Sequence, residues 1–155
     1  MQLTDLFRAD DLIVDFAPSD KWAAIEAMVD HLVRSARVEE EARPALLEQV
    51  LERERSMSTG MERGIAIPHA AVDGIADVAA CLGIVSREGG LAFESVDGQP
   101  AQLVVLLLIP RAQKLLHIRT LADVAKVLGR SEVREALLSA QSCGEAWNVL
   151  AESQT

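Results

Sequence analysis

The sequence predicts one α/β (α+β) domain over residues 1–155, with a central mixed β-sheet of about five strands and helices on both faces. Three observations favour this fold. Half of the 155 residues are apolar, which is enough for one buried core. Residues 102–109 are almost continuously apolar between Pro100 and Pro110, as is typical of a strand covered on both faces. Amphipathic segments before and after this strand can supply the covering helices.

The first part of the chain predicts one strand and one helix. Residues 12–16 are expected to be extended. A helix is expected over about residues 21–36, because Ser19 or Asp20 can cap its first turn. Apolar residues recur along it at steps of three and four: Trp22, Ile25, Val29, Leu32 and Ala36. His31 lies off this apolar stripe, and we therefore expect its side chain in solvent.

A second helix is predicted over about residues 42–55, because Pro44 suits a first helical turn. Four apolar residues form its expected buried face: Leu46, Leu47, Val50 and Leu51. Arg53 lies in its last turn, directly before a polar loop. From the residues alone, Arg53 is either a helix-end cation stabilised by the helix dipole or a ligand for an anion.

The middle of the chain alternates between turns and strands. Strands are predicted at residues 78–85, 91–93 and 102–109, because these stretches are apolar and lie between turn residues. The turns that separate them from the preceding segments are expected at residues 72–76 and 88–90, which contain glycine.

The last third of the chain predicts three helices. The first covers about residues 112–128 and is closed by Gly129. Two shorter helices follow, with Ser131 and Ser142 as their expected N-caps. Ser142 and Glu145 have the spacing of a capping box.

The most informative stretch runs from Ser58 to His69 and reads S-T-G-M-E-R-G-I-A-I-P-H. Ile65 and Ile67 alternate with small residues, which predicts a short buried strand. Pro68 cannot donate to a sheet ladder, so we expect the strand to end there and to present His69 at its tip. An imidazole can act as a neutral nucleophile near pH 7.

The loop before His69 carries groups that suit an anion. Ser58 and Thr59 offer two hydroxyls. Gly60 and Gly64 permit positive φ, so consecutive backbone N–H groups can form an anion-binding nest. A nucleophilic histidine beside such a loop favours phosphoryl chemistry, and a structural histidine is the alternative interpretation.

These residues resemble the phosphorylation-site signature of enzyme IIA domains of the bacterial phosphotransferase system. The matching class is the fructose/mannitol type (EIIA type 2), which includes the nitrogen-regulatory IIA proteins. The matching positions are Arg53-Glu54, Ser58-Thr59-Gly60 and the run from Gly64 to His69. Two departures occur: Ala70 stands where the family often has glycine, and Met61-Glu62-Arg63 stands where it tends to have small or polar residues.

The resemblance implies a phosphoryl carrier with a phosphohistidine intermediate. His69 would accept the phosphoryl group from a histidine-containing carrier protein, HPr or its nitrogen-branch (NPr-like) relative. Arg53 would bind the phosphoryl oxygens together with Ser58-Thr59-Gly60. His117, which from the residues alone is equally a core or surface histidine, would assist. The group would then pass to a IIB domain or serve as a regulatory signal.

The nitrogen-regulatory role is slightly favoured over sugar uptake, because no IIB segment is fused to these residues. Two alternatives stay open. The protein is a sugar-specific (fructose/mannitol-type) transport component, or it is a regulatory binding module that does not transfer phosphate. A metal-dependent hydrolase is disfavoured.

Charge and composition exclude several other functions. Lys and Arg total 15 against 24 Asp and Glu, so the net charge of −9 argues against a nucleic-acid partner. Six cations nevertheless gather in the two segments expected at the site: Arg53, Arg55, Arg63, Arg111, Lys114 and Arg119. Three separate histidines and two cysteines lack metal-ligand spacing, so we expect neither a metal nor another cofactor. The longest apolar run is too short to span a bilayer, and no basic-then-apolar leader opens the chain, so we expect a cytoplasmic protein without membrane insertion.

Overall fold

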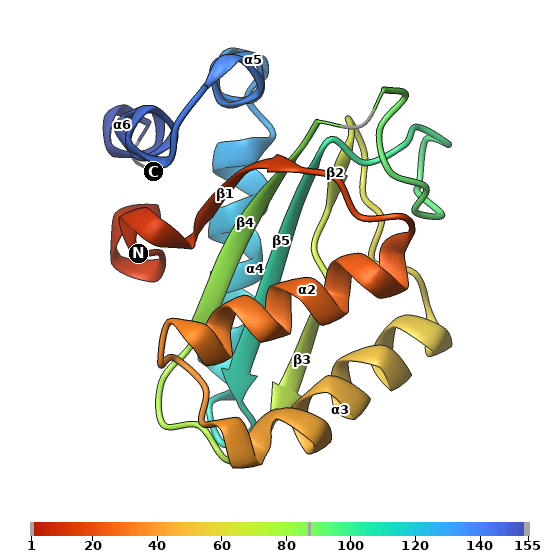
Figure 1. Ribbon diagram of the computed structural model, residues 1–155, viewed down its shortest axis with the longest axis vertical. Coiled ribbons are helices and arrows are strands. Elements are labelled where there is room, and N and C mark those ends of the chain that lie inside the picture. Colours follow the sequence, from red (N-terminus) through yellow and green to blue (C-terminus); the bar gives the residue numbers. More distant parts are fainter. Residues whose placement is uncertain (1, 87, 154–155) are drawn as a thin grey trace.

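A five-stranded mixed β-sheet forms the centre of the computed structural model, which describes residues 2–86 and 88–153 (Figure 1). Its strands are β1 (Leu12–Phe16), β2 (Ile65–Ala66), β3 (His69–Val72), β4 (Ala79–Val85) and β5 (Leu103–Pro110). The order is β1-β4-β5, and β2 and β3 both pair with the free edge of β5. Only β4 and β5 are antiparallel; the other pairs are parallel. The predicted α/β fold with a mixed sheet is therefore confirmed.

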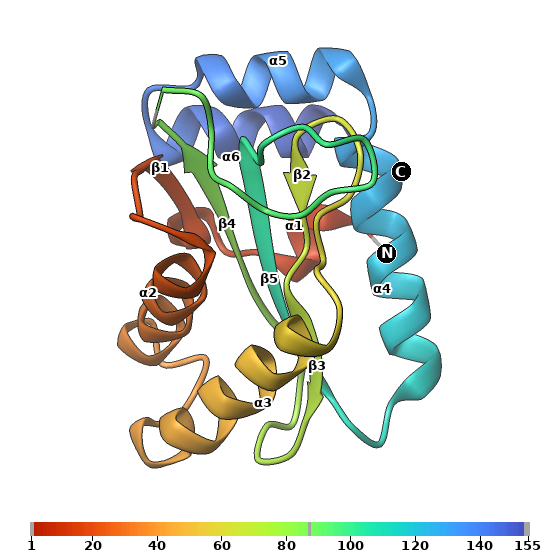
Figure 2. The same cartoon turned by 90° about the vertical axis from the view of Figure 1, so that its right-hand side faces the viewer.

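Helices cover both faces of this sheet. They are α1 (Leu3–Leu6), α2 (Lys21–Arg34), α3 (Arg43–Ser56), α4 (Lys114–Leu128), α5 (Ser131–Ser139) and α6 (Cys143–Glu152), with 3-10 turns η1 (Ala9–Asp11) and η2 (Glu40–Ala42). In Figure 1, α2 and α3 lie in front of the sheet and α4 lies behind it. Figure 2 shows α5 and α6 side by side at the upper end. Among the described residues, no helix combines the length and apolarity needed to cross a bilayer.

The central strand β5 explains why its sequence does not alternate. Leu103 through Ile109 are all fully buried. Val104, Leu106 and Leu108 pack into the core beneath α2 and α3. Leu103, Val105, Leu107 and Ile109 pack into the second core, beneath α1, α4, α5 and α6. Because both faces are covered, the residues that point to either side must be apolar.

The strand that leads to His69 differs from the prediction. It does not end at Pro68; it is interrupted there and resumes as β3, which begins at His69 and reaches Val72. Pro68 has no N–H to donate, and the N–H of Ile67 donates to the carbonyl of Thr59 instead of to β5 (3.1 Å). The loop that precedes β2 therefore pairs with the side of this segment that faces away from β5, because the carbonyl of Ile65 also accepts from the N–H of Met61 (2.8 Å).

Several smaller predictions need correction. Residues 91–93 form no strand, and Leu91 makes only an isolated bridge to Ala101. Of the two caps proposed for α2, Ser19 and Asp20, it is Asp20 that accepts from the N–H of Ala23 (2.8 Å). Ser131 is the first residue of α5 and not its cap. The error at Ser131 is a shift of one residue at the start of a helix, where local sequence does not fix the boundary.

The other predicted cap is confirmed, although the capping box is not. Ser142 accepts from the N–H of Glu145 (3.1 Å). The carboxylate of Glu145, however, accepts from the N–H of Gln141 (2.6 Å) and not from that of Ser142.

The prediction that His31 lies in solvent is wrong. Its Nε2 lies 3.1 Å from Oδ1 of Asp11, which is fully buried and also accepts from Arg37 (2.8 Å). The side chain of His31 is 16% exposed. The polar side of α2 at this point is covered by the N-terminal segment, so a residue off the apolar stripe is still enclosed. Helical periodicity gives no information about that distant contact.

Candidate functional site

Three predicted site residues converge on one cavity of about 450 Å³. His69 at the start of β3, His117 in the first turns of α4 and Arg53 in the last turn of α3 all line it. The rings of His69 and His117 meet edge to face, with centroids 5.4 Å apart and planes at 82°. The sheet thus holds His69 between the ends of two helices that belong to opposite faces of the fold.

The ring of His69 is held in one tautomer. Its Nδ1 lies 2.7 Å from the carbonyl oxygen of Ile67. Because a carbonyl oxygen can only accept, Nδ1 carries the proton, and Nε2 of the neutral ring keeps its lone pair. Burial lowers the pKa of His69 below its usual 6.5; the bond to Ile67 opposes this, and the nearby charge of Arg53 adds to it. The ring is therefore neutral, and its Nε2 is a nucleophile, at pH 7.

The depressed pKa of His69 predicts a measurable titration. In an NMR pH titration, the midpoint of the His69 ring resonances should lie below 6.5, and in Arg53→Gln it should rise, because the opposing cation is gone. The unfolded chain binds this proton more readily, so this group's contribution to stability is present above pH 6.5 and is lost as the pH falls below it.

Arg55→Gln is the matched control for that titration. Arg55 lies on the same helix but pairs with the exposed carboxylate of Glu48 (3.0 Å). A midpoint for His69 at or above 6.5 in the unmodified protein would contradict the geometry. Equal shifts in the Arg53 and Arg55 variants would assign the effect to net charge alone.

Arg53 is placed to serve both histidines. Its Nη1 donates to the carbonyl of Met57 (2.8 Å), which uses one of the five N–H donors of the guanidinium. Burial lowers the pKa of His117, and the charge of Arg53 lowers it further. The guanidinium is therefore close enough to both rings for its charge to act on them, and a fork of donors is available beside His69.

The three loop residues expected to bind phosphate lie near His69, but the hydroxyls of Ser58 and Thr59 both donate to other groups of the protein. Ser58, Thr59 and Gly60 line a second cavity of about 310 Å³ that also includes His69. The hydroxyl of Thr59 donates to buried Glu54 (2.5 Å), and that of Ser58 donates to the carbonyl of Glu94 (2.6 Å). A hydroxyl has a single proton to donate. These two side chains therefore anchor the loop in the unphosphorylated protein, and contact of Ser58, Thr59 and Gly60 with a phosphoryl group stays a prediction.

Gly60 is required for a different reason from the one predicted. Its φ is not positive, in contrast to Gly64 with φ of 76°. A Cβ at position 60 would lie 2.4 Å from the carbonyl oxygen of Glu94, which is closer than any stable contact. Glycine here allows the loop of residues 58–64 and residues 94–95 to touch.

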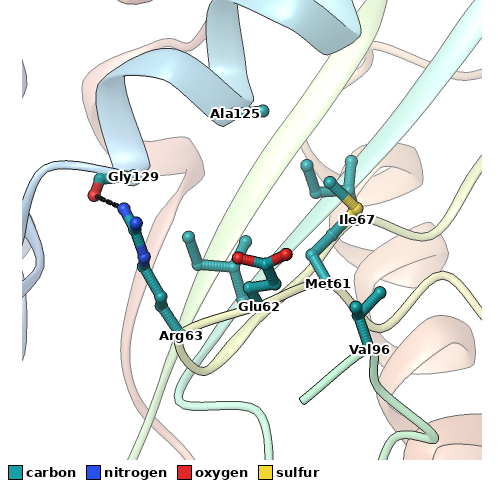
Figure 3. A pocket seen from close by; sticks show the side chains of 8 residues that line it. Met61, Glu62, Arg63, Ile67, Val96, Ala125 and Gly129 are labelled. Carbon is teal, nitrogen blue, oxygen red and sulfur yellow. Dashed lines mark hydrogen bonds between the residues drawn. The ribbon is translucent and has the colours of Figure 1, made fainter.

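Arg63, one of the residues that depart from the family pattern, tethers the same loop. Figure 3 shows Arg63 reaching the end of α4, where its Nη1 donates to the carbonyl of Gly129 (2.8 Å). Its backbone N–H donates to Asp97 (2.9 Å), and its φ is 63°. Glu62 points into a groove of about 260 Å³ that is otherwise largely apolar. His69 does not line this groove, but Met61, Ile67 and Val96 border both the groove and the cavity of about 310 Å³ that includes His69.

The rim of the site is apolar to an unusual degree. Four large apolar side chains are at least 66% exposed: Met57, Val96, Leu115 and Ile118. Met57 and Val96 border the cavity that contains His69, and Leu115 and Ile118 flank His117 in sequence on α4. Apolar side chains gathered around a polar site are typical of a surface that contacts another protein.

Sequence reasoning named Arg111 among the nearby cations and Glu54 in the family motif, but it gave neither residue a role at the site. Arg111 borders the cavity of His69 and is held by Asp73 (3.2 Å) and Gln49 (3.0 Å). Glu54 is only 2% exposed and binds the catalytic loop. A signal for Glu54 existed: it follows Leu46 and Val50 at steps of four, so an acidic residue continues the buried stripe of α3.

Residues 5–153 match the family described as "Phosphoenolpyruvate-dependent sugar phosphotransferase system, EIIA 2". A fructose-specific EIIA component from Haloferax volcanii is 36% identical over 135 residues, which cover 87% of this chain and 85% of that protein. A nitrogen regulatory protein from Klebsiella oxytoca is 37% identical over 109 residues, 70% of this chain and 66% of that one. The crystal structure of nitrogen regulatory protein IIA-Ntr from Neisseria meningitidis superposes with a TM-score of 0.84 at 23% identity, covering 96% of this chain and 98% of that one.

Proposed function

The chain belongs to the EIIA 2 family of the phosphoenolpyruvate-dependent sugar phosphotransferase system, and we propose that it is a phosphoryl carrier whose acceptor atom is Nε2 of His69. One observation carries this proposal. The carbonyl of Ile67 holds the proton on Nδ1, which leaves the lone pair of Nε2 free, and the ring borders a cavity shared with Arg53 and His117.

The proposed reaction is a transfer between two imidazole rings. Nε2 of His69 attacks the phosphorus of a phosphohistidine on the donor protein in line with the bond that breaks. The new N–P bond forms on His69 as the old one breaks, and its electron pair stays on the donor ring. The carbonyl of Ile67 remains bound to Nδ1–H and stabilises the positive charge that develops on the ring.

Two further groups act on the phosphoryl oxygens in this proposal. Arg53 pairs with them through its guanidinium fork, and His117 assists with the N–H of its neutral ring. Because bond making and breaking are nearly balanced between two similar rings, positioning and charge stabilisation provide most of the rate. Phosphorylation adds about −1.5 to −2 charges to a chain of net charge −9, so local cations are needed.

The proposed donor is HPr or an NPr-like carrier, and the proposed acceptor is a IIB domain or a regulatory target protein. Phosphotransferase IIA domains work with phosphocarriers and IIB domains. The exposed apolar rim around His69 supports a protein as the partner. Similar relatives are named for fructose transport and for nitrogen regulation at nearly equal identity. We therefore keep both sugar uptake and nitrogen regulation as proposed roles. Transfer of the phosphoryl group from His69 to a fructose-type IIB domain is the measurement that distinguishes them.

Incubation with radiolabelled phosphoenolpyruvate, enzyme I and a phosphocarrier tests this function. We expect label that is acid-labile and alkali-stable, as is typical of phosphohistidine, and that requires the carrier protein. HPr and an NPr-like carrier are compared side by side to identify the better donor. Carrier binding without any label on a folded protein would overturn the proposal and support the regulatory binding module.

A further inference from the structure

A continuous series of hydrogen bonds leads from helix α2 to the ring of His69. Lys21 Nζ donates to Glu54 (3.3 Å), and the N–H and hydroxyl of Thr59 donate to the same carboxylate (2.9 and 2.5 Å). The carbonyl of Thr59 accepts from the N–H of Ile67 (3.1 Å). The carbonyl of Ile67 accepts from Nδ1–H of His69 (2.7 Å). Lys21, at the start of this series, is separated in sequence from every other member by at least 33 residues, so only the fold brings them together.

Glu54 is the centre of this series. Its side chain is 1% exposed, and an ionised carboxylate is costly to bury unless donors satisfy its oxygens. Here three donors do so, and two of them come from the single residue Thr59. The two bonds to Thr59 fix both its backbone and its side chain, so the start of the catalytic loop has one position relative to α3.

The loop holds Ile67 on the side that faces away from β5. Ile65 and Ala66 pair with β5 before it, and His69 pairs with β5 after it. The N–H of Leu107 on β5 donates to the carbonyl of Pro68 (3.0 Å), while the N–H of Ile67 donates to Thr59. The residue whose carbonyl binds the ring of His69 is therefore fixed from two sides, by β5 through its neighbours and by the loop through its own N–H.

We propose that Glu54 is a positioning residue that acts through Thr59 and Ile67 to hold the proton of His69 on Nδ1 and so keep Nε2 free to react. The role of this tautomer in transfer rests on the proposed phosphoryl acceptance at His69. The tautomer itself is a property of the resting protein. The charge of Lys21 balances the buried carboxylate, so the anchor does not place an uncompensated negative charge beside the site of phosphorylation.

Nitrogen-15 NMR of the histidine ring tests this inference directly, because the shifts of Nδ1 and Nε2 report which nitrogen carries the proton. In the unmodified protein at pH 8 we expect the Nδ1–H tautomer of His69 to dominate. Glu54→Gln removes the charge and one strong acceptor, and it should give a mixture of tautomers and lower the labelling rate about tenfold. Thr59→Val keeps its backbone N–H bond and loses only the hydroxyl, so its rate should fall about fivefold.

Glu48→Gln is the matched control, since Glu48 lies on the same helix and pairs only with exposed Arg55 among the contacts described for it. The double variant Glu54→Gln/Thr59→Val should be little slower than Glu54→Gln alone, because both changes break one series. A dominant Nδ1–H tautomer in both Glu54→Gln and Thr59→Val, with rates like that of Glu48→Gln, would overturn the inference. If Glu54→Gln does not fold, Thr59→Val decides the question by the same criteria.

The role of Glu54 and the proposed phosphoryl-carrier function can fail independently in these experiments. Absence of label on the unmodified protein would remove the function, while the tautomer measurement would still report whether Glu54 orients His69. Label on the unmodified protein together with an unaffected Glu54→Gln variant would remove only the role of Glu54.

Discussion

Replacement of His69 by alanine is expected to abolish acid-labile labelling by the phosphocarrier. The reason is chemical: the variant has no nitrogen lone pair at the position where the His69 ring borders the cavity of Arg53 and His117. The labelled protein is measured after transfer from radiolabelled phosphoenolpyruvate through enzyme I and the carrier. Label in the variant should be indistinguishable from a reaction without carrier.

Two further variants make this result specific. His69→Gln retains a polar side chain of similar length and should also lose all label, which separates loss of the nucleophile from creation of a cavity. His31→Gln removes a histidine away from the site, where Asp11 keeps its bond from Arg37 (2.8 Å), and should be labelled normally. Persistent label on folded His69→Ala would identify a different acceptor, and peptide mapping would then locate it.

Replacement of Arg53 by alanine is expected to slow phosphoryl acceptance roughly 10- to 100-fold while the protein remains folded. A hydrogen bond to a charged group is worth about 1.5–3 kcal/mol, and one lost in the transition state lowers the rate by the corresponding factor. The initial labelling rate at saturating carrier measures the effect. Arg53→Lys keeps the charge but lacks the planar fork, so its labelling rate should lie between those of the unmodified protein and Arg53→Ala.

The competing interpretation of Arg53 predicts a different pattern. As a helix-end cation it would contribute only about 0.3–1 kcal/mol to folding, and its removal would leave transfer unchanged. Arg55→Ala, at the same end of α3 but paired with Glu48 (3.0 Å), is the matched control for that interpretation. Equal labelling rates for both alanine variants, with equal losses of stability in thermal unfolding, would exclude Arg53 from the reaction.

Most of the framework was predictable because it depends on local patterns. The uninterrupted apolar run of β5 predicted a strand buried on both faces, and every residue from Leu103 to Ile109 is buried. The apolar stripes predicted α2 and α3 to within a few residues. The position of His69 after Pro68 predicted a histidine at the tip of a strand that ends there, whereas His69 begins β3, which continues to Val72.

The errors share a physical cause, which is competition for polar groups by partners far away in sequence. His31 looked solvated, but Asp11 from the N-terminal segment binds it (3.1 Å). The hydroxyl of Thr59 looked free in the sequence, but it donates to the buried carboxylate of Glu54. A sequence indicates which side chains can donate or accept, and it does not indicate which of several possible partners the fold brings within 3 Å.

By itself, then, the sequence determined the class of fold, the family and the identity of the candidate nucleophile, because apolar periodicity and a contiguous motif are encoded by neighbouring residues. Only the tertiary structure decided that Nδ1 of His69 is the protonated nitrogen, that Arg53 and His117 share its cavity, and that the loop hydroxyls serve as anchors. These properties depend on hydrogen-bond distances between segments as far apart as α2, α3 and β3, and such distances exist only once the sheet has assembled.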